Sequence, residues 1–208
     1  MMKTPKPRKE PLLQCGESGR DRGLGGNILA LRLTGCPSTF FATETEERIR
    51  RAALEGVASL FVTALLLSAA LLALFYDDAN PRHGYRLFHT ISYGSFVQEL
   101  LLPLVAALLL GQLIGAVLLL IPVIRGKLDL ARFLDIAGCS MVPSVLLMIP
   151  PYLGVFLAGY FQAKIIIGGL SVSGMPIDEA RSLAVTCVTF AWLLPTLFFL
   201  RIVVFSIG

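Results

Sequence analysis

Charged side chains are scarce in this sequence, and their scarcity excludes most soluble folds. Only 15% of the 208 residues are Asp, Glu, Lys or Arg, whereas 55% are hydrophobic and the mean hydropathy is +0.75. A soluble domain has about 25% charged residues. The composition therefore predicts a protein that lies mostly within a lipid bilayer.

Residues that carry enzyme chemistry are also few. The chain has two histidines and four cysteines, and it has no CxxC pair, no HExxH motif and no GxSxG motif. These residue types at these spacings define no catalytic triad and no zinc site. No dense basic patch with interleaved aromatic residues is present either, which is the pattern of a nucleic-acid binder. We therefore expect no enzyme, no cofactor or metal site, no disulfide and no nucleic-acid partner.

Long uncharged runs are abundant. About 20 apolar residues cross a hydrocarbon core of about 30 Å, and four runs reach or approach that length: Gly56–Tyr76, Leu100–Ile124, Ile136–Phe161 and Ser182–Leu200. The sequence therefore predicts an all-α, polytopic bundle of membrane helices, with spans at about 56–76, 100–124, 136–161 and 182–204. A shorter run, 165–177, has 13 uncharged residues and is expected to be re-entrant or interfacial.

Prolines interrupt the third run. Pro143 lies near its start, and Pro150 and Pro151 lie about halfway along its 26 residues. A straight helix of that length would measure about 39 Å, so the run must kink or break. A kink gives four spans with both termini on one side, whereas a turn at the paired prolines gives five spans and places Lys164 inside the fourth. We favour four spans, because a lysine within a span must snorkel at some cost.

The N-terminal part divides into a tail and a charged helix. Residues 1–43 are rich in Pro, Gly, Lys and Arg, which is typical of a disordered tail. Residues 44–55 predict a juxtamembrane helix, because three glutamates each precede an arginine by four positions. The basic residues expected to anchor at anionic lipid headgroups are Arg48, Arg50, Arg51, Arg125, Lys127 and Arg132. These six basic residues lie on the same side of the membrane as the N-terminus in a four-span arrangement, whereas the loops on the opposite side carry four. Because basic residues are more frequent on the cytoplasmic side, the sequence predicts a cytoplasmic N-terminus.

Small and polar residues inside the spans predict where helices meet. Gly111 and Gly115 form a GxxxG pair in the second span, and Gly138 lies at the start of the third; such residues let helix backbones approach closely in lipid. The default partner is a helix of the same chain, and a second copy is the alternative. Gln112 is an amide within a span, so it either hydrogen-bonds a neighbouring helix or lines a polar pathway.

One part of the chain resembles a known family. The charged loop "RGKLDLARFL", the small-residue segment "DIAGCSMVP" and the apolar run that follows resemble the Yip1-domain family, particularly its bacterial members. The stretch "TFAWLLPTLFF" with Trp192 is similar to their last span. The resemblance covers about residues 55–208, whereas the family usually has five spans and the signatures of its eukaryotic members are absent here.

The resemblance implies a non-enzymatic scaffold or membrane-organising, trafficking-type protein that acts through other membrane proteins, further copies of itself or bilayer shape. It implies no functional residue. A bacterial inner membrane is then the expected location, ahead of an endomembrane or organelle, although seven basic residues against three acidic ones in the first 40 also fit a targeting peptide. The alternative function is a small transporter or channel subunit in which Gln112 lines the path.

Overall fold

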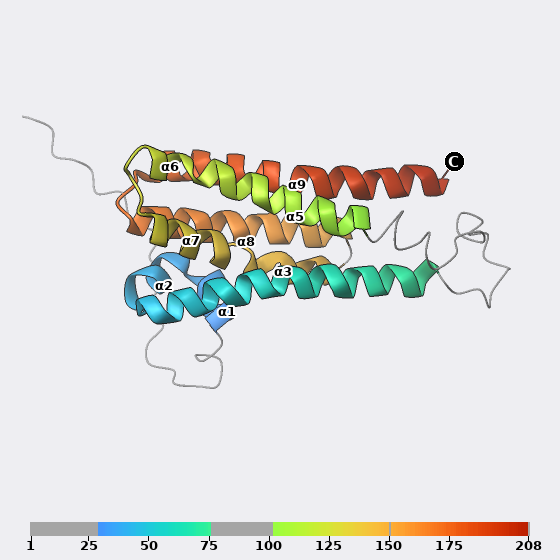
Figure 1. Cartoon of the computed structure of the whole chain (residues 1–208), viewed down its shortest axis with the longest axis horizontal. Helices are drawn as coiled ribbons and strands as arrows, with labels where there is room; N and C mark the ends of the chain where they lie inside the picture. The colour runs from blue at the N-terminus through green and yellow to red at the C-terminus, as the bar shows by residue number, and fades with distance from the viewer. Residues whose placement is uncertain (1–28, 76–101, 150, 208) are drawn as a thin grey trace, which may run out of the picture.

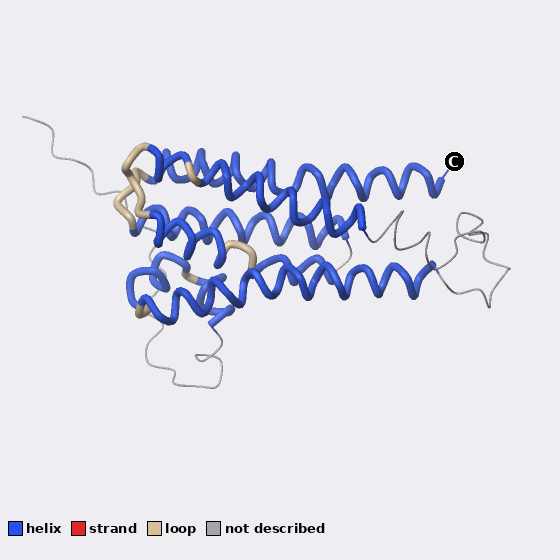
Figure 2. The backbone as a smooth tube through the Cα atoms, viewed as in Figure 1, coloured by secondary structure: helices blue, strands red, loops and turns tan. Residues whose placement is uncertain are grey.

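The structure is an all-helical bundle. The computed structural model describes residues 29–75, 102–149 and 151–207, and every regular element in those ranges is a helix (Figure 2). Five segments are long and apolar enough to cross a membrane: Glu46–Ala70, Leu102–Ile124, Leu130–Met148, Leu153–Val172 and Ile177–Phe198. The chain is therefore a multi-pass membrane protein, as the composition predicts.

The chain runs back and forth along the bundle (Figure 1). α3, the pair α7 and η4, and α9 run in one direction, whereas α5 with α6 and α8 run in the other. We call the end at which α3 begins the N-side end and the opposite one the far end. The helices, in chain order, are α1 (Leu29–Gly35), α2 (Pro37–Thr43), α3 (Glu46–Phe75), α5 (Leu102–Leu119), α6 (Ile121–Ile124), α7 (Leu130–Cys139), the 3-10 helix η4 (Val142–Met148), α8 (Pro151–Val172) and α9 (Ile177–Ile207).

α8 is the central helix of the bundle. It packs against α9, against η4 and against the short helix α2, while α3 packs on α7 and η4, and α5 packs on α9. Ile165 and Leu170 of α8 are completely buried. Large apolar side chains such as Leu65, Ile124 and Phe156 are exposed on the outside of the bundle, where a bilayer supplies the apolar surroundings that water would not.

The preference for four spans is wrong, because the third run is broken between the end of η4 at Met148 and the start of α8 at Pro151. η4 ends at Met148, Ile149 is extended with ψ 160°, and α8 begins at Pro151. Proline is well suited to the first position of a helix, where its missing N–H group would have no partner anyway. Pro150 itself lies outside the described residues. The expected span 136–161 is thus divided between α7–η4 and α8, and residues 165–172 of the expected re-entrant piece belong to α8.

Lys164 is accommodated within α8 by a contact that the sequence does not reveal. Its ammonium group donates a hydrogen bond to the carbonyl oxygen of Gly35, at the C-terminal end of α1, over 3.2 Å. It also lies 5.8 Å from the ring centroids of Tyr160 and Phe161. A helix C-terminus carries partial negative charge, so α1 provides the lysine with a partner. The argument against a fifth span therefore fails.

The expected disordered tail is wrong for residues 29–43. These residues form α1 and α2, and Leu33, Phe40 and Phe41 are buried in the main apolar cluster of the bundle. Two seven-residue helices would be marginal alone, so packing against α8 stabilises them. Residues 1–28 lie outside the described residues. Cys36 is disulfide-bonded, so the expectation of no disulfide is also wrong.

Two glycines shape the turns at the N-side end. Gly126 and Gly174 have φ of +67° and +87°, a left-handed conformation that glycine adopts without steric cost. After α8, the N–H of Met175 donates to the carbonyl of Leu170 over 3.2 Å, which closes the helix in the manner of a Schellman motif. The short turn returns the chain directly into α9, beside α8.

Candidate functional site

A chain of three buried polar side chains joins α5, α8 and α9. Gln162 donates from Nε2 to Oε1 of Gln112 over 2.8 Å, and Trp192 donates from its indole Nε1 to Oε1 of Gln162 over 2.7 Å. All three side chains are buried. Gln112 lies near the middle of α5 and Gln162 near the middle of α8. The site is therefore a polar cluster at about the mid-depth of the apolar bundle.

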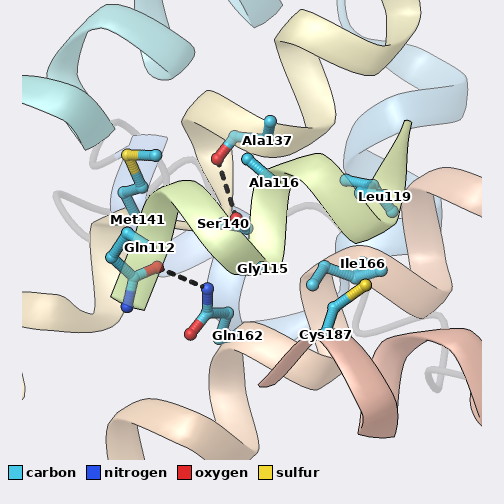
Figure 3. Close-up of a pocket in the computed structure, with 10 residues that line it drawn as sticks. All are labelled: Gln112, Gly115, Ala116, Leu119, Ala137, Ser140, Met141, Gln162, Ile166 and Cys187. Atoms are coloured by element: carbon cyan, nitrogen blue, oxygen red, sulfur yellow. Dashed lines mark hydrogen bonds between the residues drawn. The ribbon is translucent and has the colours of Figure 1, made fainter. Parts of the chain in front are cut away.

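One atom of the cluster, Nε2 of Gln112, is buried and has no hydrogen-bond partner within the described part of the chain. The cluster borders a cavity of about 10 Å³ between α5, α7, α8 and α9 (Figure 3). In Figure 3, Gln112 and Gln162 lie on one side of the cavity, and Ile166 and Cys187 lie on the other. The residues that line it are Gln112, Gly115, Ala116, Leu119, Ala137, Ser140, Met141, Gln162, Ile166 and Cys187.

The two glycines of the GxxxG pair bring α5 onto α9 within the same chain. A Cβ on Gly111 would overlap the carbonyl oxygen of Ala191, and one on Gly115 would lie 2.9 Å from the Ala191 side chain. Proline has no N–H, so Pro195 cannot donate to the carbonyl of Ala191, four residues before it. Gly111 therefore lets α5 approach a carbonyl group that lacks its usual helical donor.

The third glycine brings α3 onto the broken third span. A Cβ on Gly56 would overlap the carbonyl oxygen of Gly138, and one on Gly138 would lie 2.7 Å from the Ala53 side chain. One turn further along α3, the hydroxyl of Ser59 donates to the carbonyl of Gly56 over 2.7 Å and lies 3.3 Å from the carbonyl oxygen of Met141. Non-helical backbone at membrane depth is tolerated only where protein or a cavity surrounds it. α3 thus covers the break between α7 and η4, which opens just before Pro143, the second residue of η4.

The expected headgroup anchors all lie toward the N-side end, and most are paired with acids. Glu44, whose side chain is only 4% exposed, pairs with Arg32 and with Arg48, the latter over 3.1 Å. The other pairs are Arg50 with Glu46 at 3.8 Å, Arg51 with Glu55 at 3.7 Å and Lys127 with Glu179 at 2.6 Å. Helix α3 begins at Glu46 and continues past residue 55, so the expected separate helix 44–55 is part of a longer one.

The two remaining anchors differ in their surroundings. Arg132 lies over the ring of Phe41, with its guanidinium carbon 5.8 Å from the centroid, and so contributes to holding α2 on the bundle. Arg125 is exposed at the end of α6. Arg125 is thus open to a lipid or protein partner.

The sequence prediction missed Gln162, although a signal for it was present. The four-span arrangement ends the third span at residue 161, so Gln162 falls just outside it and Gln112 is taken as the amide of the span interior. With five spans, both amides lie inside spans. Trp192 was noted only for the family resemblance, because its hydrogen bond depends on packing between helices distant in sequence.

Comparison of the chain with protein-family models, with curated proteins and with solved structures found no match. The described residues contain no group of three or more His, Cys, Asp or Glu side chains that could hold a metal ion. The fold and the site together define a multi-pass α-helical membrane protein with a polar cluster at the centre of its bundle.

The two glutamines are expected to be energetically coupled. Gln112→Leu and Gln162→Leu each leave a buried partner unsatisfied, which costs about 1–3 kcal/mol, whereas the double variant removes both groups. We therefore expect the double variant to lose at least about 0.5 kcal/mol less stability than the sum of the single losses, measured by unfolding in detergent micelles. As a control, Thr186→Leu combined with Gln112→Leu should be additive, since exposed Thr186 bonds within α9. Additive losses for the glutamine pair would contradict the hydrogen bond.

Proposed function

We propose that this chain is a non-enzymatic, Yip1-like membrane protein that organises other membrane proteins through its N-side end. The observation that carries the proposal is the concentration of charged side chains at that end, where most basic residues pair with acids and Arg125 is exposed. Interfaces of this kind fit acidic segments of partner proteins as well as anionic lipid headgroups. The buried amide cluster supports the same function, because its hydrogen bonds hold the bundle in one arrangement.

The distribution of charge favours a cytoplasmic N-side end. Five passes place eight lysines and arginines in or next to the N-side ends of the spans: Arg48, Arg50, Arg51, Arg125, Lys127, Arg132, Lys164 and Arg181. Three belong to the segment between α3 and α5 or to the end of α9: Arg82, Arg86 and Arg201. Eight basic residues against three is a larger difference than the six against four of the four-span arrangement. It is larger because five passes move Lys164 and Arg181 to the N-side end.

The disulfide at Cys36 points the other way, because disulfides persist mainly in oxidising compartments. The charge asymmetry weighs more heavily, because it comes from three separate places: the start of α3, the turn between α6 and α7, and the turn between α8 and α9. We therefore propose the bacterial inner membrane as the location, with the N-side end in the cytoplasm and the C-terminus outside.

A transporter or channel subunit is the second candidate function. It is favoured by one specific feature, the amide pair and cavity next to a broken helix at mid-depth. Broken helices at this depth form substrate sites in many transporters. In this candidate function, Gln112 is a pathway residue rather than a packing residue.

Site-specific photo-crosslinking in cells distinguishes the two functions. A photoreactive residue replaces Leu130, which is 58% exposed at the N-side end, or Val145 as a control, which is 51% exposed in η4. The scaffold function predicts defined protein adducts at Leu130 and none at Val145. Adducts at neither position, together with an ion flux in proteoliposomes that Gln112→Leu abolishes in a correctly assembled protein, would contradict it.

A further inference from the structure

One carboxyl group is buried within the third span. Asp135 of α7 is only 5% exposed and belongs to the segment Leu130–Met148, which is apolar enough to cross a membrane. In the sequence it comes immediately before the uncharged run 136–161, a position that suits an acid at the membrane surface. Ionisable side chains inside membrane spans are costly, and they often mark sites where ions or protons bind.

The packing of α7 on α3 buries this group. Cys139 comes four residues after Asp135 and therefore lies on the same face of α7. The thiol of Cys139 donates to the carbonyl of Ile49 in α3 over 3.7 Å, so this face is turned toward α3. Ile49 and Ala52 of α3 are each only 2% exposed. The contact between the two helices is therefore close and largely apolar.

The charged groups nearest to Asp135 have other partners. Arg50 and Glu46 of α3 and Arg132 of α7 are the groups that act on it electrostatically. Arg50 forms its ion pair with Glu46, and Arg132 lies over the ring of Phe41. Within the described part of the chain, Asp135 forms no ion pair and no side-chain hydrogen bond of its own.

The other two helices that pack on α7 are α5 and α8, and neither supplies a counter-charge. α5 has no charged residue between Leu102 and Leu119. The ammonium group of Lys164 in α8 donates to the carbonyl of Gly35. A carboxylate at position 135 would thus be a buried charge without a direct partner.

We propose that Asp135 binds a proton in the packed bundle, so that its carboxyl group is neutral at neutral pH. An unpaired carboxylate is strongly unfavourable in an apolar interior, and binding a proton removes the charge. The two nearby arginines favour the charged form, but their side chains are directed to Glu46 and Phe41. The proposal does not depend on either candidate function, because it concerns the contact between α3 and α7.

Infrared spectroscopy of the full chain in an ester-free detergent detects such a proton directly. The carbonyl group of a protonated carboxylic acid absorbs apart from both carboxylates and backbone amides. At neutral pH the wild type should show this band, and Asp135→Asn should remove the absorbance of one carboxyl group. Glu179→Gln is the control and should leave the band unchanged, because the carboxylate of Glu179 pairs with Lys127 at 2.6 Å. No loss of absorbance in Asp135→Asn would overturn the proposal.

Thermal unfolding in the same detergent at several pH values gives an independent readout. Above about pH 4, where an ordinary aspartate is ionised, the unfolded chain releases the proton that the folded chain keeps, so stability should fall as the pH rises. The unfolding midpoint of Asp135→Asn should fall less over the same pH range, because the amide carries no titrating proton. A charged Asp135 held by Arg50 and Arg132 predicts instead that Asp135→Asn is less stable than the wild type at neutral pH, or unfolded. Either result would overturn the proposal.

Discussion

Gly56→Leu should abolish the folded bundle. A Cβ at this position would overlap the carbonyl oxygen of Gly138 and lie 3.3 Å from a methyl carbon of Val142. The first obstacle is backbone, which no rotamer change can move, so α3 would have to separate from α7. Overpacking in a close-packed interior costs about 1–3 kcal/mol and sometimes more, and we expect about 4 kcal/mol or more here because a backbone is displaced.

The matched control is Ala58→Leu, two residues further along the same helix. Ala58 is exposed on the outside of the bundle, so the added side chain meets lipid or detergent. Stability in detergent, measured by fluorescence-detected size exclusion after heating, should be unchanged for Ala58→Leu and lost for Gly56→Leu. Similar behaviour of the two variants would contradict the close contact between α3 and α7.

Phe40→Ala should destabilise the protein by about 3–5 kcal/mol, the usual cost of removing a buried phenylalanine ring. Phe40 is 1% exposed and stands edge-on to Phe41, with the ring centroids 5.5 Å apart. Both rings hold α2 against the bundle. Losing the Phe40 ring would loosen α2 and, with it, α1. The carbonyl of Gly35, which accepts the hydrogen bond from Lys164, would then be displaced.

Leu31→Ala is the control for this prediction, because Leu31 in α1 is 60% exposed. It should change the midpoint of thermal unfolding little. If Phe40→Ala also had little effect, residues 29–43 would be a loosely attached tail rather than part of the folded bundle.

The sequence predicts the helical class well because its signal is local. Uncharged runs of about 20 residues need no knowledge of tertiary contacts, and the segments around α3, α5 and α9 follow from them. The paired prolines were also recognised as the point where the third run must bend. The preference for a kink rested on the cost of a lysine within a span, and the carbonyl of Gly35 that offsets this cost for Lys164 lies far away in the sequence.

The candidate site was predicted only in part for the same reason. Gln112 stands out in the sequence as an amide in an apolar run. Its partner Gln162 becomes visible only when the fourth span is placed, and the role of Trp192 only when α8 and α9 are packed together. α1 and α2 gave little signal because each has only seven residues, too few to show a helical period, so they are stabilised by packing rather than by their own propensity.

The central claim is that the chain crosses the membrane five times, with a turn between η4, which ends at Met148, and α8, which begins at Pro151. It is tested most directly by labelling with a membrane-impermeant maleimide in intact cells. One cysteine is placed in the turn before α7, as Asp129→Cys, and another is appended after Gly208, each in a cysteine-free background. Five passes predict that the two positions lie on opposite sides, so that only the appended C-terminal cysteine reacts from outside if the N-side end is cytoplasmic. Labelling of both positions from the same side would contradict the account and restore the four-span arrangement.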